Sequence, residues 1–363
     1  MIKKTASIII ALLLCLSARA QVWTDAAQLP LYGKAAEDTY SRYSRLPASM
    51  QQECRPPVWR LGLNSAGLYL RFRSASPTLW VRWESLNSHV MNHMSATGSR
   101  GVDLYVKQDG KWRFLAAGKP ELKKALSERK LMSNMEPKMR EYMLYLSLYD
   151  GITKLEIGSE EGCPVLPPEL ESPRAERPVV MYGTSITQGG CVSRPGMLYT
   201  SIMSRNLDRE FINLGFSGNA LLDMEIARLM ASVPHPSLFV LAFSENASAE
   251  QITERGPAFF RILRDAHPDV PIVFVQSVRY AYSHLDQKEA AKRQAKMDAL
   301  QGLYQSLKRA GEKRIFYADP GGSAAFQDAE ASVDGCHLTD LGTQRFAEAL
   351  LPVLKKALKH GRN

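Results

Sequence analysis

The first candidate for chemistry is a serine that directly follows a short apolar run. Residues 178–182 have the composition of a buried strand, and Gly183-Thr184-Ser185 comes next, ahead of a helical stretch. A serine at such a strand end exposes its Oγ beside backbone N–H donors, as a nucleophile requires. Glycine and serine are also common in ordinary strand-to-helix turns, so the motif alone does not decide between the two interpretations.

A histidine near the other end of the chain can supply the base that this serine needs. Asp334-Gly335-Cys336-His337 precedes the last predicted helix. An aspartate three residues before a histidine can accept the imidazole Nδ1–H, which leaves Nε2 free to take a proton. A lone Asp-x-x-His is commonly a helix cap with a surface histidine. Together with Ser185 in the same sheet, however, it completes a Ser-His-Asp triad.

Two further segments at predicted strand ends can stabilise negative charge on a substrate carbonyl oxygen. Gly218 lies in the turn after one strand, and Asn246 follows the next. The N–H of Gly218 and the Nδ2–H of Asn246 would join the N–H of Ser185 as three donors to an oxyanion. The alternative is a turn glycine and a helix-capping asparagine. Glu245 would oppose the oxyanion if its carboxylate pointed inward, so we expect it to point away.

The elements that position these residues are apolar strands alternating with helices. Strands are predicted at 178–182, 210–214, 236–243, 271–275 and 314–317, with helices at 248–266, 287–310 and 339–359. This alternation predicts an α/β fold with a parallel sheet between two helical layers, a three-layer α/β/α arrangement. In such a sheet the chemistry gathers at the carboxyl ends of the strands.

In the first half of the chain the hydrophobic pattern has a period of two residues. Apolar and polar residues alternate at 68–73, 79–83, 102–106 and 144–148, and Asp109-Gly110 and Asp150-Gly151 mark turns. Short alternating strands joined by turns predict an antiparallel β-sandwich. The proline-rich, acidic stretch 164–177 can hold neither a ladder nor a helix. We therefore predict a sandwich domain over 21–163, a linker over 164–177 and a second domain over 178–363.

Four blocks in the order Ser, Gly, Asn and Asp-x-x-His make residues 178–358 resemble an SGNH (GDSL-like) hydrolase. The match is strongest in Gly-Thr-Ser-Ile-Thr-Gln-Gly and Asp-Gly-Cys-His-Leu-Thr-Asp-Leu-Gly. The first half resembles the N-terminal domain that precedes this hydrolase in some bacterial exported proteins, at Met91-Asn92-His93-Met94 and Gly101-Val102-Asp103-Leu104-Tyr105. The resemblance implies a flavodoxin-like sheet preceded by a jelly-roll-like sandwich.

The same resemblance implies the role of each site residue. Ser185 would be the nucleophile, Gly218 and Asn246 the oxyanion donors, Asp334 the orienting acid and His337 the base. The sequence departs from the family pattern at Thr184, where aspartate is usual, and in Ala-Phe-Ser-Glu-Asn, where the pattern is Gly-x-Asn-Asp. Relatives with this architecture mostly remove short acyl groups from carbohydrate.

The sequence therefore predicts a serine esterase that deacylates, and most simply deacetylates, carbohydrate without a cofactor. Two alternatives stay open: a carbohydrate-binding surface protein with an inactive hydrolase site, and a lipase or lysophospholipase. The sugar, the acyl position and the oligomeric state are not indicated by the sequence.

The N-terminus has the pattern of a secretory signal. A basic start, an apolar run over 6–16 and Ala18-Arg19-Ala20 predict a signal peptide over 1–20, cleaved after Ala20, and hence a periplasmic or extracellular protein. A membrane anchor is the alternative, but the run is shorter than the ~20 residues of a spanning helix. Cleavage would lower the net charge of +9 by three. The remaining charge is dispersed, so we expect neither a nucleic-acid partner nor a membrane span.

Four cysteines remain after the predicted cleavage site: Cys54, Cys163, Cys191 and Cys336. In an oxidising compartment they could form two disulfides in any of three pairings, or stay buried thiols. The predicted triad would bring Cys191 near Cys336, which permits but does not compel a bond between them. We expect that pairing, with Cys54–Cys163 as the second.

Other histidines and aromatic residues offer weaker candidates. His235, His267 and His284 lack metal-ligand spacing, so no metal is predicted. His93 could line a cleft where the domains meet, although a structural role is the simpler interpretation. Three tryptophans could form a sugar platform, but aromatic residues in strands more often belong to the core: Trp80, Trp83 and Trp112.

Overall fold

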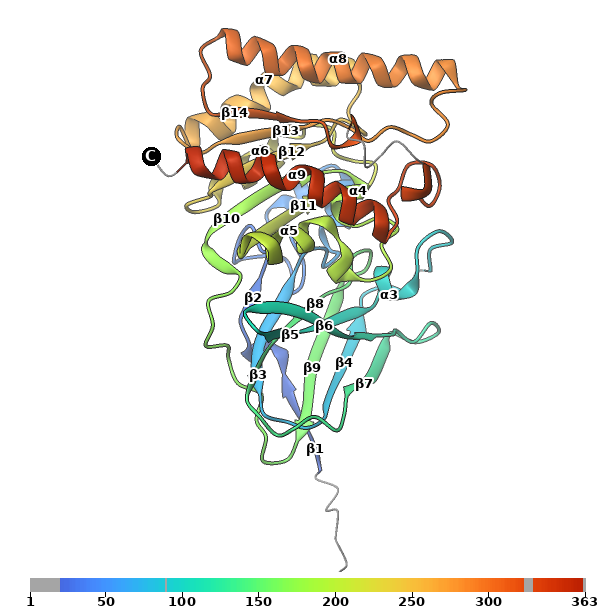
Figure 1. The fold of residues 1–363 in the computed structure, drawn as a ribbon, viewed down its shortest axis with the longest axis vertical. Helices are drawn as coiled ribbons and strands as arrows, with labels where there is room; N and C mark the ends of the chain where they lie inside the picture. Colours follow the sequence, from blue (N-terminus) through green and yellow to red (C-terminus); the bar gives the residue numbers. More distant parts are fainter. Residues whose placement is uncertain (1–19, 89, 323–328, 362–363) are drawn as a thin grey trace, which may run out of the picture.

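The computed structural model describes residues 20–88, 90–322 and 329–361 (Figure 1). Two antiparallel sheets occupy one end of the molecule and a parallel sheet covered by helices occupies the other (Figure 1). The predicted signal peptide lies outside the described residues, except for Ala20. Within the described part of the chain, no helix is both long and apolar enough to cross a membrane.

The antiparallel sheets form the predicted sandwich. One has the order β1-β9-β4-β7 and the other β2-β3-β8-β5-β6. Apolar side chains of both sheets meet between them, and Trp83 is fully buried there, so this tryptophan belongs to the core. The strands are β1 (Gln21–Asp25), β2 (Leu31–Tyr32), β3 (Tyr69–Ser74), β4 (Leu79–Ser85), β5 (Val102–Gln108), β6 (Lys111–Gly118), β7 (Leu126–Met132), β8 (Arg140–Tyr145) and β9 (Ile152–Glu160).

The predicted turn at Asp109-Gly110 joins β5 to β6 as a hairpin. Both residues have positive φ, 50° and 70°, as a tight turn between antiparallel strands requires. Among the residues described in the first half of the chain there are also one 3-10 turn and three short helices: η1 (Ala26–Gln28), α1 (Met50–Glu53), α2 (Pro56–Gly62) and α3 (Ala96–Ser99).

The parallel sheet has the strand order β11-β10-β12-β13-β14, which is the 2-1-3-4-5 order of a flavodoxin-like fold. All five predicted strands are present, as β10 (Arg174–Gly183), β11 (Arg209–Gly215), β12 (Leu238–Ala242), β13 (Ile272–Val275) and β14 (Ile315–Ala318). Apart from the partly buried Ala175 of β10 and Phe316 and Tyr317 of the edge strand β14, their apolar side chains are buried on both faces, as expected for a sheet between two helical layers.

Helices cover both faces of this sheet. The long ones lie where the sequence predicts them. On one face α5 (Tyr199–Leu207) and α9 (Asp340–His360) pack against Val179 and Met181. On the other, α6 (Met224–Ser232), α7 (Ala249–Ala266) and α8 (Gln287–Arg309) share a core with Val180 and Tyr182. The remaining short elements of the described ranges are α4 (Ser185–Gln188), η2 (Pro195–Met197), η3 (Pro320–Gly322) and η5 (Ala329–Ala331).

One segment within the range predicted for the sandwich packs elsewhere. Met50, Cys54, Val58 and Trp59 are buried in the core formed by the parallel sheet and its helices α6–α8. This segment has no alternating pattern. It forms the short helices α1 and α2 and therefore contributes no strand to the sandwich. Parts of the predicted linker also pair with neighbouring strands or belong to one. Leu166 pairs with Arg73 of β3, and β10 begins at Arg174.

Neither predicted disulfide is present, and this corrects the expectation for all four cysteines. Cys54, Cys191 and Cys336 carry free thiols, which excludes both the Cys191–Cys336 and the Cys54–Cys163 pair. Cys54 packs on the parallel sheet, whereas Cys163 lies in the sandwich close to Ser74. The alternative of unpaired thiols therefore describes Cys54, Cys191 and Cys336.

Candidate active site

Ser185 lies where β10 ends, as the first residue of α4. The turn before it is tight, because a Cβ on Gly183 would lie 2.0 Å from the Thr187 Oγ1 and 2.9 Å from the Ala242 carbonyl oxygen. Gly189, with a φ of 113°, ends the turn after it. The strand end and these two glycines leave the Ser185 side chain nearly buried, with its hydroxyl directed at the segment before α9.

Ser185, His337 and Asp334 form a continuous chain of hydrogen bonds. The Ser185 Oγ lies 2.9 Å from His337 Nε2, and His337 Nδ1 lies 2.7 Å from Asp334 Oδ2. The other carboxylate oxygen of Asp334 accepts the backbone N–H groups of Cys336 and His337 at 3.0 and 2.8 Å. These last two bonds fix the carboxylate within its own turn.

The ionisation of Asp334 determines the tautomer of His337. Desolvation raises the pKa of this carboxyl group, but the hydrogen bonds from His337 and from two backbone N–H groups outweigh it, so the pKa lies below its ordinary value. An ionised carboxylate can only accept, so Nδ1 of His337 is the donor. In the neutral imidazole, Nε2 is then an acceptor for the Ser185 hydroxyl, which is the arrangement of a general base.

Gly218 and Asn246 lie in segments that follow the two strands on either side of β10. In the sheet, Gly183 is in register with Gly215 of β11 and with Ala242 of β12. Gly218 has a φ of 67°, and a Cβ there would meet no atom within 4 Å. The structure therefore brings the ends of these strands to one level at the same edge of the sheet.

Residues 217–220 contain the predicted oxyanion donor Gly218 and are here called the oxyanion segment. They are fixed by side chains on both sides. Gln188 Oε1 accepts the Ser217 N–H at 2.9 Å, and Asn246 Oδ1 accepts the Ala220 N–H at 3.2 Å. Because Oδ1 of Asn246 is occupied, its Nδ2 is the side-chain atom left to donate. These bonds connect α4, the oxyanion segment and Asn246.

Glu245 has its carboxylate turned to another part of the fold. Its Oε1 accepts the Val278 N–H at 3.2 Å, and Lys296 Nζ donates to its main-chain oxygen at 2.9 Å. Burial raises the pKa of the Glu245 carboxyl group. The expected direction, away from the predicted oxyanion donors, agrees with these contacts.

The first half of the chain supplies contacts to the site that the sequence analysis missed. Arg55 donates to the Asn219 Oδ1 at 3.0 Å and forms a salt bridge of 2.6 Å with Asp223. Arg45, fully buried, donates to the Gly215 carbonyl oxygen at 2.8 Å. The Tyr149 hydroxyl donates to the Ser185 carbonyl oxygen at 3.3 Å. No spacing rule singles out such residues, because these partners lie between 36 and 170 positions away in the sequence.

The Gly101-Val102-Asp103-Leu104-Tyr105 motif connects the sandwich to the loop that follows the nucleophile turn. Asp103 is fully buried, and its Oδ2 accepts from Arg194 at 2.8 Å and from the Gly196 N–H at 2.9 Å. The Tyr105 hydroxyl accepts from Arg194 at 2.7 Å. Asp340, at the start of α9, accepts from the N–H of Ser193 in the same loop at 2.8 Å. The motif thus joins the two halves beside the triad.

His93 reaches the triad from the sandwich. Its ring centroid lies 5.7 Å from that of His337, so it does line the domain junction. Ligand-type atoms of His93, Cys191, Asp334 and His337 all lie within 4.8 Å of one another and could hold a metal ion. Both nitrogens of His337 are, however, already used in the triad.

The three histidines first considered for metal binding make other contacts. His267 Nε2 lies 2.8 Å from the Ala231 carbonyl oxygen, and His284 Nδ1 lies 2.9 Å from that of Ala281. His235 lines a separate small cavity of about 320 Å³ with His267.

Two family models match the chain in succession. The N-terminal domain of SGNH hydrolase-type esterases matches residues 21–165, and the GDSL-like lipase/acylhydrolase family matches residues 176–355. A comparison with curated proteins gives no significant match.

Solved structures extend this similarity over nearly the whole chain. A GDSL-like lipase from Bacteroides ovatus is 32% identical, with a TM-score of 0.88, over 94% of this chain and 98% of its own. A salicylyl-acyltransferase from a tetracycline biosynthetic pathway is 18% identical, with a TM-score of 0.74, over 93% and 98%. A family two carbohydrate esterase from Clostridium thermocellum, solved with cellohexaose, is 15% identical, with a TM-score of 0.59, over 81% and 94%.

Proposed function

Because the chain belongs to the GDSL-like lipase/acylhydrolase (SGNH hydrolase) family, we propose that it is an exported serine esterase that removes acetyl groups from carbohydrate. The observation that carries the proposal is the chain of hydrogen bonds from Asp334 through His337 to the Ser185 Oγ. Such a chain activates a hydroxyl for attack on an ester carbonyl.

The proposed reaction has two halves. The Ser185 Oγ attacks the acyl carbonyl carbon while His337 Nε2 takes its proton, and the oxyanion lies against the N–H groups of Ser185 and Gly218 and the Asn246 amide. His337 then gives the proton to the oxygen of the leaving sugar, and an acyl-serine remains. Water, deprotonated by the same nitrogen, hydrolyses that ester and restores the Ser185 hydroxyl.

A carbohydrate substrate is supported by the fold and by the surroundings of the serine. The Clostridium thermocellum carbohydrate esterase shares this fold. Around Ser185 the chain is polar and rich in glycine, in Thr184, Thr187, Gln188, Gly189 and Gly190. These residues suit a small acyl group better than a long alkyl chain. The alternative of an inactive, carbohydrate-binding protein rested on Glu245, whose carboxylate bonds instead to the Val278 N–H.

The test is the rate on aryl esters of increasing acyl length, measured as kcat/KM. We expect acetyl esters to be hydrolysed in clear preference to chains of eight or more carbons, with Ser185→Ala as the inactive control. An acyl pocket for lipid would gain up to ~0.8 kcal/mol per buried CH₂. A rate that climbs steadily with chain length would therefore identify a lipase and contradict the proposal.

A further inference from the structure

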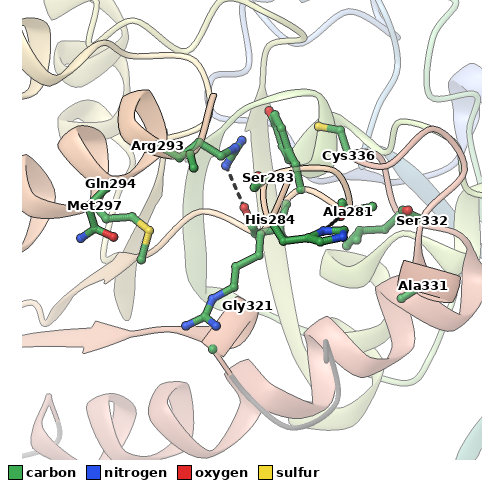
Figure 2. A pocket seen from close by; sticks show the side chains of 16 residues that line it. Ala281, Ser283, His284, Arg293, Gln294, Met297, Gly321, Ala331, Ser332 and Cys336 are labelled. Carbon is green, nitrogen blue, oxygen red and sulfur yellow. Dashed lines mark hydrogen bonds between the residues drawn. The ribbon is translucent and has the colours of Figure 1, made fainter. Parts of the chain in front are cut away.

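A cavity of about 720 Å³ adjoins the catalytic loop 334–337, and no step of the proposed reaction uses it (Figure 2). Its walls come from the segment after β13, the start of α8, η3 after β14, and residues 331–338. Figure 2 shows Arg293, Gln294 and Met297 of α8 on one side and Ser332 and Cys336 on the other. The cavity thus lies at the same edge of the sheet as Ser185, beyond β12.

The size and polarity of the cavity suit a sugar unit rather than the acetyl group. Cavities of 300–1,000 Å³ hold whole small-molecule ligands, whereas an acetyl group has three heavy atoms. Hydroxyl, amide and imidazole groups line it alongside apolar patches: Tyr280, Ser283, His284, Gln294 and Ser332. Ser283 has a buried Oγ with no hydrogen-bond partner among the described residues.

The lining of the cavity carries two arginines, Arg279 and Arg293, and none of its described lining residues is acidic. Arg293 is buried and already compensated, since it donates to the Val278 carbonyl oxygen at 2.8 Å and lies 3.5 Å from Glu289. Behind it, Lys296 Nζ donates to the main-chain oxygen of Glu245 at 2.9 Å.

Among the described residues that line the cavity, Arg279 is the arginine without a compensating partner. It lines the cavity, its side chain is exposed, and it has neither an ion pair nor a hydrogen-bond partner within the described ranges. Asp319, directly before η3, accepts the Gly322 N–H at 2.8 Å. A guanidinium in this setting can form a bidentate, charge-assisted pair with a carboxylate or sulfate group of a ligand.

We propose that this cavity is a subsite for an anionic sugar unit of the polymer whose neighbouring unit carries the ester, with Arg279 as the residue that recognises its charge. The proposal rests on the proposed esterase function and narrows its substrate class to acidic polysaccharides. The cavity is connected to the catalytic loop directly, because the Ala281 N–H donates to the Gly335 carbonyl oxygen at 2.9 Å. A polymer that spans both places would be held with its acylated unit at Ser185.

The first experiment compares acetylated trigalacturonate with acetylated cellotriose, and uses 4-nitrophenyl acetate as a reference substrate that carries no sugar. We expect kcat/KM to favour the acidic trisaccharide by roughly 10–100-fold, the range of a charge-assisted contact. Arg279→Gln should abolish that preference, Arg279→Lys should keep part of it, and neither should change the rate on 4-nitrophenyl acetate. Arg228→Gln, an exposed arginine of α6, is the control with the same charge change.

Equal rates on the two trisaccharides, or a preference that survives Arg279→Gln, would overturn the subsite. The second experiment keeps this result separate from failure of the esterase proposal, because it needs no turnover. Calorimetry on Ser185→Ala should show that trigalacturonate or sulfated cellotriose binds at least 10-fold more tightly than neutral cellotriose, and that Arg279→Gln removes the difference. The tighter of the two anions identifies the chemical group, and equal binding of all three ligands contradicts the proposal.

Discussion

The triad and the oxyanion segment lie at the carboxyl ends of the same sheet but are held in different ways. Ser185, His337 and Asp334 come from the parallel domain alone and contact one another directly. Residues 217–220 are instead held from both halves of the chain, by Gln188 on one side and by Arg55 on the other. The first half of the chain is therefore part of the support of the active site, and not only a domain attached in front of it.

The loop after the nucleophile turn is also held from both halves of the chain. Residues 193–196 are bound to the sandwich through Asp103 and to the start of α9 through Asp340. A side chain that is removed from the triad should therefore affect chemistry alone. One that is removed from the contacts that hold residues 193–196 or 217–220 should affect both stability and rate.

We expect the largest loss of kcat from substitutions in the triad. Ser185→Ala and His337→Ala should each lower kcat by at least roughly 10⁴-fold, and the double variant should be little slower than either, because the two residues act as one unit. The melting temperature should change little. Additive losses in the double variant, measured by kcat on 4-nitrophenyl acetate, would contradict a shared role.

Asn246→Ala comes next, with a loss of roughly 10²–10³ in kcat if its amide donates to the oxyanion. The substitution also removes the acceptor of the Ala220 N–H, so Asn246→Asp serves as the matched control. Aspartate keeps that acceptor but replaces the donor by a negative charge, and it should be at least as slow as alanine. A rate like that of the unmodified enzyme in Asn246→Ala would remove this residue from the site.

Arg55→Ala tests whether the first half of the chain supports the oxyanion segment. We expect kcat to fall roughly 10-fold as the segment shifts. The unfolding free energy should fall by about 2 kcal/mol, because the buried Asp223 carboxylate loses its partner. Arg60→Ala, an exposed arginine of α2, should do neither.

The two effects of Arg55→Ala can be separated by a second substitution. The double variant Arg55→Ala, Asp223→Ala no longer has an unpaired buried carboxylate, so denaturant unfolding should show stability regained while kcat stays low. A recovered kcat in that variant would mean that Arg55 acts only through stability.

The fold could be predicted from the sequence because its signals are local. Alternation with period two marks the sandwich, and the buried strands at 178–182 and 236–243 stand out as apolar runs bounded by turns. The order of Ser185, Gly218, Asn246 and Asp334 along the chain then locates the site, since parallel strands end at one edge of the sheet. The local turn from Asp334 to His337 needs only three residues to form its hydrogen bonds.

The junction could not be predicted, because its partners are distant in sequence. Arg45, Arg55 and Asp103 meet residues of the parallel domain through tertiary packing, and a buried arginine has no distinctive spacing. The disulfide expectation failed for a related reason. Nearness of Cys191 and Cys336 to the triad does not specify which way each thiol points, and Cys336 lines the cavity beside Tyr280.

The last prediction concerns the contact between β11 and the first half of the chain. Here we expect the smallest effect on activity and a pH-dependent effect on stability. Glu210 is buried there and accepts the N–H of Gly33 from the first half of the chain. Burial raises its pKa to about 7, and burial likewise raises the pKa of Asp103 to about 6. Each group binds its proton more tightly in the folded chain than in the unfolded one, where it ionises near its ordinary value. The stabilisation from these protonated groups is therefore full below about pH 4, and it is lost as the pH rises through about 6 for Asp103 and about 7 for Glu210.

Glu210→Gln sharpens this prediction, since glutamine can still accept the Gly33 N–H but cannot ionise. For the unmodified chain, urea unfolding at pH 5 and pH 8 should show a loss with rising pH on the order of 3 kcal/mol from Glu210. The variant should lose that part of the slope, keep the part due to Asp103, and hydrolyse 4-nitrophenyl acetate at an unchanged rate, because Glu210 supports the junction and not the triad. An unchanged pH slope would mean that the folded chain does not hold a proton on Glu210, and a slower hydrolysis would show that this edge of β11 also supports the oxyanion segment.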